Sequence, residues 1–334
     1  SIFAFEVLHR MGLQFFEVLN YAVMCALICL FVMRGLWGLE RFGAIWAFID
    51  KMGEVDSRHL LLGVVLGLIG AGMALLFMEI NRHLKKGAMA VRLDEKRRPV
   101  LCGAIGGVLI GLIGVWLPPT MFWSEYEMET VANPEIKLAH VWPKGGYWGL
   151  APWFQGHYTP AIWFGLAFAK LLTINISVVS GMRGGFIFPL MFAGACLGRG
   201  LATVPGIPWV SDQAPVLAAM VTAAAVCTGV TRTPFAVTLI LTALVGDPGV
   251  AAPTLCGALT SFFVLMNRPF FLAQRDRDDI IFKPLAFGEM PRGVSGISAG
   301  ESSESSGNNF RIPAGHLATS GSRTSETTLN ELAA

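Results

Sequence analysis

Long apolar runs without charge recur along most of the chain. Because the hydrocarbon core of a bilayer is about 30 Å thick, a helix of about 20 apolar residues crosses it. The candidates are residues 60–78, 99–123 and 248–267, a shorter run at 21–33, and a run at 145–169 whose one potential charge is His157. A backbone in lipid must satisfy its own hydrogen bonds, and the alternation of a β-barrel is absent from the sequence. The pattern therefore predicts an all-α polytopic membrane protein.

Residues 171–246 are almost as apolar but are punctuated by glycine and proline. The interruptions are Gly181, Gly184, Gly185, Pro189, Gly194, Gly198, Pro205, Gly206, Pro208, Gly229 and Pro234. Simple helices of about 20 residues do not fit between them, so we expect short, broken helices that are buried in protein or line a cavity. Broken helices indicate a transport site, because the start of a half-helix favours an anion. A pair of proline-kinked structural helices is the alternative.

The composition excludes an ordinary soluble protein. Hydrophobic residues make up 54% of the chain and charged residues 14%, whereas soluble domains carry about 25% charge. The 25 basic and 23 acidic residues leave no excess for binding nucleic acid. The six cysteines lie inside apolar runs and form no CxxC pair, so neither a disulfide framework nor a metal site is expected.

The distribution of charge predicts the topology. The link between two strong spans, residues 82–98, contains Arg82, Lys85, Lys86, Arg92, Lys96, Arg97 and Arg98. The positive-inside rule places this basic link in the cytosol and the more mixed link at 35–58 on the other side of the membrane. From about residue 291 the chain is rich in Ser, Gly and Thr, which predicts a disordered polar tail.

The strongest motif for function is Met182-Arg-Gly-Gly-Phe-Ile-Phe-Pro189. Two glycines allow close approach to the backbone, and the next residues start a helix whose first N–H groups have no partner within the helix. Together with the helix dipole, these groups form an anion site. They hold a halide without a full positive charge, which would bind it too tightly for release. The paired nucleophile and base of an intramembrane enzyme are absent from the sequence, so we expect no enzyme.

This motif resembles the GxFxP segment of the CLC family of chloride channels and chloride/proton exchangers. Other regions resemble the family in the same order: Phe3-Ala-Phe-Glu-Val7 and residues 62–79, 103–118 and 220–244. The likeness covers about residues 1–285. It implies a CLC-type fold of two inverted repeats of broken helices, and a homodimer with one ion path in each subunit.

The resemblance also implies a division of the chain. Residues 1–98 are then the end of the first membrane repeat with its cytosolic link, residues 99–290 the second repeat with the final helix, and residues 291–334 the tail. The family's other anion-lining motifs, GSGIP and GxEGP, do not occur in the sequence. Eukaryotic members often add two CBS domains, for which the residues after Arg268 leave no room, so we expect no nucleotide site. No cofactor is expected either.

The resemblance assigns the anion to named residues. The backbone N–H groups of Gly185, Phe186 and Ile187 are expected to bind it, and Phe188 and Pro189 to line its path. In the family the position of Ile187 is a phenylalanine. This change leaves the backbone donors in place, so anion binding is expected to survive it.

Further positions bear on the inner end of the path. Phe271 stands where the family has a tyrosine whose hydroxyl contacts the inner anion, so one hydrogen bond, worth about 1.5–3 kcal/mol to a charged partner, is lost. Val7 aligns with the internal proton-relay glutamate of the exchangers, and valine cannot carry a proton. An alignment shifted by one residue places Glu6 there instead.

The sequence thus predicts transport of chloride or a related anion across a lipid bilayer, more like a voltage-gated channel than an exchanger. A proton-coupled chloride antiporter of the same fold is one alternative. A truncated membrane fragment or interaction subunit that transports nothing is another, because the two upstream anion motifs do not occur.

Overall fold

The chain folds into helices. The computed structural model describes residues 21–32, 46, 56–93, 98–133, 158–207, 215–268 and 270, without residues 22, 30, 126 and 183. No strand occurs among these residues. Four of the described helices are long and apolar enough to cross a membrane. They are α3 (Ser57–Ala90), α4 (Pro99–Trp116), α6 (Pro160–Val179) and the stretch Pro248–Leu265, which joins the 3-10 turn η4 (Pro248–Val250) to α11 (Ala251–Leu265). The predicted all-α polytopic membrane protein is confirmed.

The punctuated segment forms short helices, as expected. It contains α7 (Ile187–Thr203), α9 (Pro215–Thr231) and α10 (Pro234–Val245). At 17, 17 and 12 residues, these helices are shorter than the about 20 residues that usually cross a bilayer. The described chain also contains η1 (Pro118–Thr120), α5 (Met128–Ala132) and helical residues at 21, 23–29 and 31–32.

The predicted boundaries were wrong at two helices. The apolar run 99–123 is helical only as far as Trp116, because the Pro118-Pro119 pair cannot continue a helix. The predicted division between residues 169 and 171 falls inside α6, which runs unbroken from Pro160. Its start is set by the Thr159 side chain, which accepts a hydrogen bond from the Ile162 amide at 3.4 Å.

The helix α3 is longer than the bilayer core is thick. It starts at a capping box, in which Asp56 accepts from the Ser57 amide at 2.6 Å and the Asp56 amide donates to His59 Nδ1 at 2.8 Å. Its 34 residues span about 50 Å at 1.5 Å per residue. Because its charge-free part ends before Glu79, the last turns of α3 extend past the hydrocarbon.

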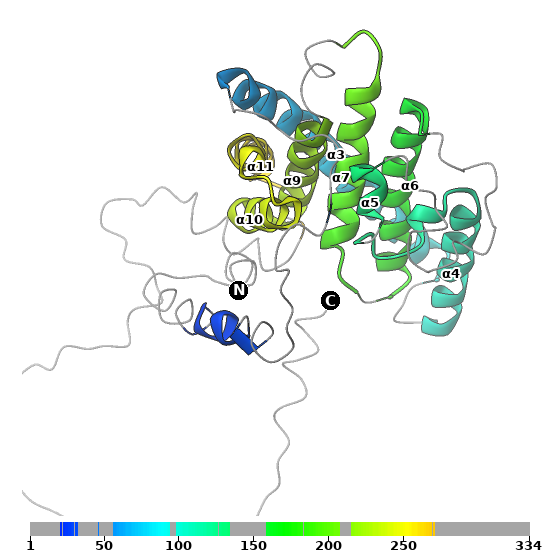
Figure 1. Ribbon diagram of the computed structural model, residues 1–334. Coiled ribbons are helices and arrows are strands. Elements are labelled where there is room, and N and C mark those ends of the chain that lie inside the picture. The colour runs from blue at the N-terminus through cyan, green and yellow to red at the C-terminus, as the bar shows by residue number, and fades with distance from the viewer. Residues whose placement is uncertain are drawn as a thin grey trace, which may run out of the picture. The chain divides into compact units, whose positions relative to one another are not determined.

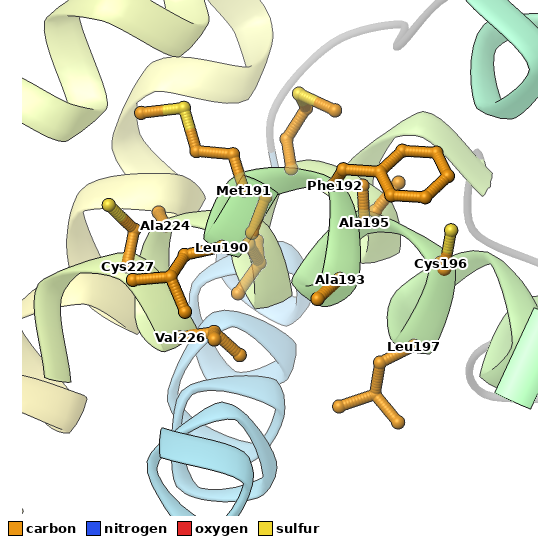
Figure 2. Packing of buried hydrophobic residues seen from close by; sticks show 14 of the residues in the cluster. Leu190, Met191, Phe192, Ala193, Ala195, Cys196, Leu197, Ala224, Val226 and Cys227 are labelled. Atoms are coloured by element: carbon orange, nitrogen blue, oxygen red, sulfur yellow. The ribbon is translucent and has the colours of Figure 1, made fainter. Parts of the chain in front are cut away.

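The helix α9 lies at the centre of the described bundle. Every residue from Val216 to Thr231 is buried. Helices α3, α7, α10 and α11 all contact α9, and Figure 1 shows it between α7 and α11. In the core, Leu190 of α7 points toward Ala224 and Cys227 of α9 (Figure 2). Small side chains along α9 allow helices to approach it on several sides at once.

Glycines at the helix crossings leave no room for a side chain. Where α7 crosses α9, a Cβ atom on Gly198 would lie 2.1 Å from the carbonyl oxygen of Ala218. Where α3 crosses α11, a Cβ atom on Gly67 would lie 2.7 Å from the carbonyl oxygen of Gly257. The backbones are therefore in direct contact at both places.

Hydroxyl groups join the same helices. The Thr222 hydroxyl of α9 lies 2.7 Å from the carbonyl oxygen of Gly194 in α7. The Ser261 hydroxyl of α11 donates to the carbonyl oxygen of Ala225 in α9 at 2.7 Å. In an apolar bundle such bonds satisfy polar groups that water cannot reach, and each contributes about 0.6–2 kcal/mol.

A buried arginine holds the end of α11. Arg232, between α9 and α10, has a positive φ of 62°. Its guanidinium donates to the carbonyl oxygen of Met266 at 2.6 Å, just past the last turn of α11. Beyond it, the ring of Phe270 lies 5.4 Å from the ring of Phe77 in α3. The chain is thereby fixed immediately before Phe271.

We predict that Gly198→Ala lowers the free energy of unfolding by about 1–3 kcal/mol, because the added methyl overpacks the α7–α9 crossing. The matched control is Gly72→Ala in α3, where an added Cβ has no atom within 4 Å. That change removes a helix-interior glycine and is expected to be neutral or stabilising by up to about 1 kcal/mol. Denaturation of the purified protein in detergent measures both. Equal stability of the two variants would contradict the direct backbone contact.

Candidate functional site

The site begins where α6 ends. Gly181 has a φ of 78°, in the left-handed region. Its amide donates to the carbonyl oxygen of Val178 at 3.3 Å, and the Met182 amide donates to that of Ser177 at 3.0 Å. This pair of bonds is a Schellman motif, for which glycine is the preferred residue at the left-handed position. It stops α6 at Val179 and turns the chain toward α7, so the helices are interrupted at Gly181, one of the expected interruptions.

The start of α7 has exposed backbone donors. The helix begins at Ile187 after Phe186, which occupies the N-cap position without a side-chain cap. The Leu190 amide donates to the carbonyl oxygen of Phe186 at 3.0 Å, whereas Pro189 has no amide proton. Among the residues that the structure describes, no acceptor bonds to the amides of Ile187 and Phe188. These two N–H groups lie at the positive end of the helix dipole.

A pocket of about 210 Å³ lies against this break. Its wall includes residues 120–123 after α4, Lys170, Thr173, Ser177 and Val178 of α6, and Gly184, Gly185, Phe186 and Pro189. A Cβ atom on Gly184 or Gly185 would have no neighbour within 4 Å. The glycines therefore leave the backbone open to a small ligand and are not required for packing.

The structure brings part of the predicted anion site together. Gly185, Phe186 and Pro189 all line the pocket. Phe188 instead lies edge-on to the ring of Trp46 at 6.4 Å, so its side chain faces away from that wall. The helix N-terminus was predicted to be buried, but Gly184 and Gly185 are exposed in this chain, while residues 186–188 are half-buried. Which backbone groups bind an anion stays a prediction.

The other predicted positions lie outside the described residues. They are Phe271, Val7 and Glu6. The structure does place Phe270, which directly precedes Phe271, because the Phe270 ring packs on Phe77. In the described chain no group of three potential metal ligands comes together.

A buried lysine in the pocket wall was missed from the sequence. Lys170 is 2% exposed. Its ammonium group donates to the carbonyl oxygens of Thr120, at 3.0 Å, and of Phe122. It also lies 5.9 Å from the centre of the Phe192 ring in α7. Lys170 therefore clamps the turn after α4 to α6 and α7, on the wall shared with the α7 start.

A buried acidic side chain, Glu127, lies near this clamp. Glu127 is fully buried and interacts electrostatically with Lys170. Because opposite charges attract, Glu127 reduces the positive charge that Lys170 presents to the pocket. The sequence signal for this clamp was available: Lys170 is the one charged residue between Lys144 and Arg183, and a lone charge in an apolar membrane run indicates a functional site.

Comparison with known proteins identifies a family. The model of the family described as voltage gated chloride channel matches residues 1–266. The "Putative ion-transport protein YfeO" of Escherichia coli O139:H28 (strain E24377A / ETEC) is 25% identical over 238 residues, which cover 69% of this chain and 48% of that protein. Proteins of the same name from Shigella boydii serotype 18 and E. coli strain SE11 are similar to the same extent. The chain spans about half the length of the curated relatives it matches.

We predict that Lys170→Met lowers the free energy of unfolding by about 3–5 kcal/mol, because it leaves a buried charge on Glu127 uncompensated. Adding Glu127→Gln should recover part of this loss, since that change removes the charge. The control is Lys85→Met, at an exposed position of α3, for which a change within about 0.5 kcal/mol is expected. Unfolding in detergent measures all three. A loss no larger than that of the control would contradict the clamp.

Proposed function

The chain belongs to the voltage-gated chloride channel family, and we propose that the protein moves chloride or a related anion across a membrane, with the start of α7 as part of the ion's path. The observation that carries this proposal is the helix start itself. Two backbone N–H groups, at Ile187 and Phe188, have no acceptor among the described residues and lie in the chain between Phe186 and Pro189, which both line the pocket.

Such a site suits an ion that must leave again. Backbone amides and the helix dipole attract an anion with partial charges. A free ammonium or guanidinium group would hold it more tightly and slow its release. The buried cation in the pocket wall is Lys170, whose ammonium group donates to the carbonyl oxygens of Thr120 and Phe122 and whose charge is attracted by Glu127. The pocket therefore offers moderate attraction, which conduction requires.

The proposal concerns the whole protein, since the chain corresponds to about half of its curated relatives. We propose a homodimer with one ion path in each subunit, on the resemblance to the family. We also propose that transport is channel-like, because Val7 has no group that could take up a proton. A proton-coupled antiporter is the second candidate, favoured by the carboxylate of Glu6 directly before Val7.

We predict that vesicles containing the purified wild-type protein release chloride. We also predict that Gly185→Ala weakens halide binding by about 1.5–3 kcal/mol, as expected when one charge-assisted hydrogen bond is lost. The added methyl enters open space, so the fold should be retained while the backbone donors become less accessible. Calorimetric titration with chloride and initial rates of chloride efflux measure the two effects.

Gly72→Ala is the matched control, because its added methyl also meets no atom within 4 Å but lies in α3. Wild-type affinity in Gly185→Ala, with the fold intact, would show that the ion does not approach this stretch of backbone. Vesicles that retain their chloride with wild-type protein would contradict transport and favour the interaction subunit.

We predict that a chloride gradient drives no stoichiometric uptake of protons into these vesicles, since a proton path needs a titratable group at its inner end. Vesicles with a pH electrode outside them report this directly. Protons moving against their own gradient would establish the antiporter instead. In that case Glu6→Gln should abolish proton movement and leave chloride movement, which would identify Glu6 as the relay.

A further inference from the structure

The chain just after α3, at Arg92 and Leu93 of the basic link, lies near the end of α6, where the break that leads to α7 begins. The chain turns at Arg92, whose φ is 55°, and the Leu93 amide donates to the carbonyl oxygen of Ala88 at 2.9 Å. The thiol of Cys102, in the first turn of α4, lies 3.4 Å from the carbonyl oxygen of Leu93 and 3.7 Å from that of Val179. Because Val179 is the last residue of α6, Leu93 lies near the point where α6 ends and the break begins.

Two cations of this link flank the contact. Arg92 directly precedes Leu93. Arg98 occupies the N-cap position of α4, and its carbonyl oxygen accepts a hydrogen bond from the Cys102 amide at 2.9 Å. Both side chains are exposed, and neither forms an ion pair with a described residue. Their charges therefore remain available to ions in solution.

The surrounding charge does not cancel them. Besides its basic residues, the stretch 79–98 contains the acidic residues Glu79, Asp94 and Glu95. Glu79 is itself engaged, with a carboxylate oxygen 2.6 Å from Arg82 and the other 3.9 Å from Arg268. Basic residues outnumber acidic ones in the link, so its field is positive.

We propose that Arg92 and Arg98, the entrance pair, concentrate small inorganic anions at the cytosolic end of the path and so raise the rate at which they reach the start of α7. This inference rests on the proposed transport function. Exposed charges of one sign next to a site raise the local concentration of its ligand and its rate of arrival. Because these side chains are solvated, they attract an anion without trapping it.

Steering by exposed charges depends on ionic strength. The screening length is about 10 Å at 0.1 M ionic strength and about 3 Å at 1 M. Steering by the entrance pair should therefore operate at the lower value and vanish at the higher one. A structural role of the two arginines would persist at both.

The test compares Arg92→Gln/Arg98→Gln with Lys85→Gln/Lys86→Gln in the complete protein, reconstituted in phosphatidylcholine vesicles. Both double variants remove two exposed positive charges, but Lys85 and Lys86 lie within α3, which ends at Ala90, before the turn at Arg92. At constant chloride, ionic strength is set with an impermeant salt. We expect the entrance-pair variant to lower the initial chloride efflux about two- to fivefold at about 0.1 M and to match wild type at about 1 M. The control should match wild type at both.

The possible failures are distinct. Wild-type protein that releases no chloride would overturn the proposed function, and this inference with it. Normal wild-type release with equal rates for the two double variants would overturn the inference alone. A loss that is the same at both ionic strengths would mean that the arginines act on structure. A loss that occurs only when phosphatidylglycerol is added to the vesicles would mean that the link binds lipid headgroups, which also excludes steering.

Discussion

Direct contact between helix backbones is the constraint on which the rest of this structure depends. At Gly198 and Gly67 the carbonyl oxygen of a neighbouring helix occupies the space that a side chain would need. This contact allows α9 to be surrounded by α3, α7, α10 and α11. Since α7 is held along α9 through its middle, its first turn is fixed at the break after α6, where the pocket opens.

Several polar side chains inside the bundle are satisfied by neighbouring helices, and the start of α7 differs from them. Thr222 and Ser261 donate to carbonyl oxygens of neighbouring helices, and Lys170 does the same from α6. Each of these donors is satisfied by protein. The amides of Ile187 and Phe188 have no acceptor in the described chain. A donor left open beside a pocket is a place for a ligand, whereas a satisfied donor contributes only to the fold.

The spans and their breaks could be predicted from the sequence, because charge-free length and the positions of Gly181 and Pro189 act locally. The extent of α6 could not, since the charge of Lys170 suggested a boundary where the fold instead buries the ammonium against distant carbonyl oxygens. The direction of the Phe188 side chain could not be predicted either, because it depends on a contact with Trp46, which is distant in the sequence. The family likeness located the anion motif, but not the clamp that supports its pocket.

The burial of α9 has a consequence for how the protein is made. At 17 residues, with neighbours on every side, α9 has no face that suits lipid alone, and α10 after it is shorter still. A translocon releases long apolar helices such as α3 into the bilayer one at a time, whereas α9 is at the short end of what can span by itself and is buried on all sides. Its entry has to be coupled to that of α10 and to docking on α3 and α7, so biogenesis here ends with an assembly step inside the membrane.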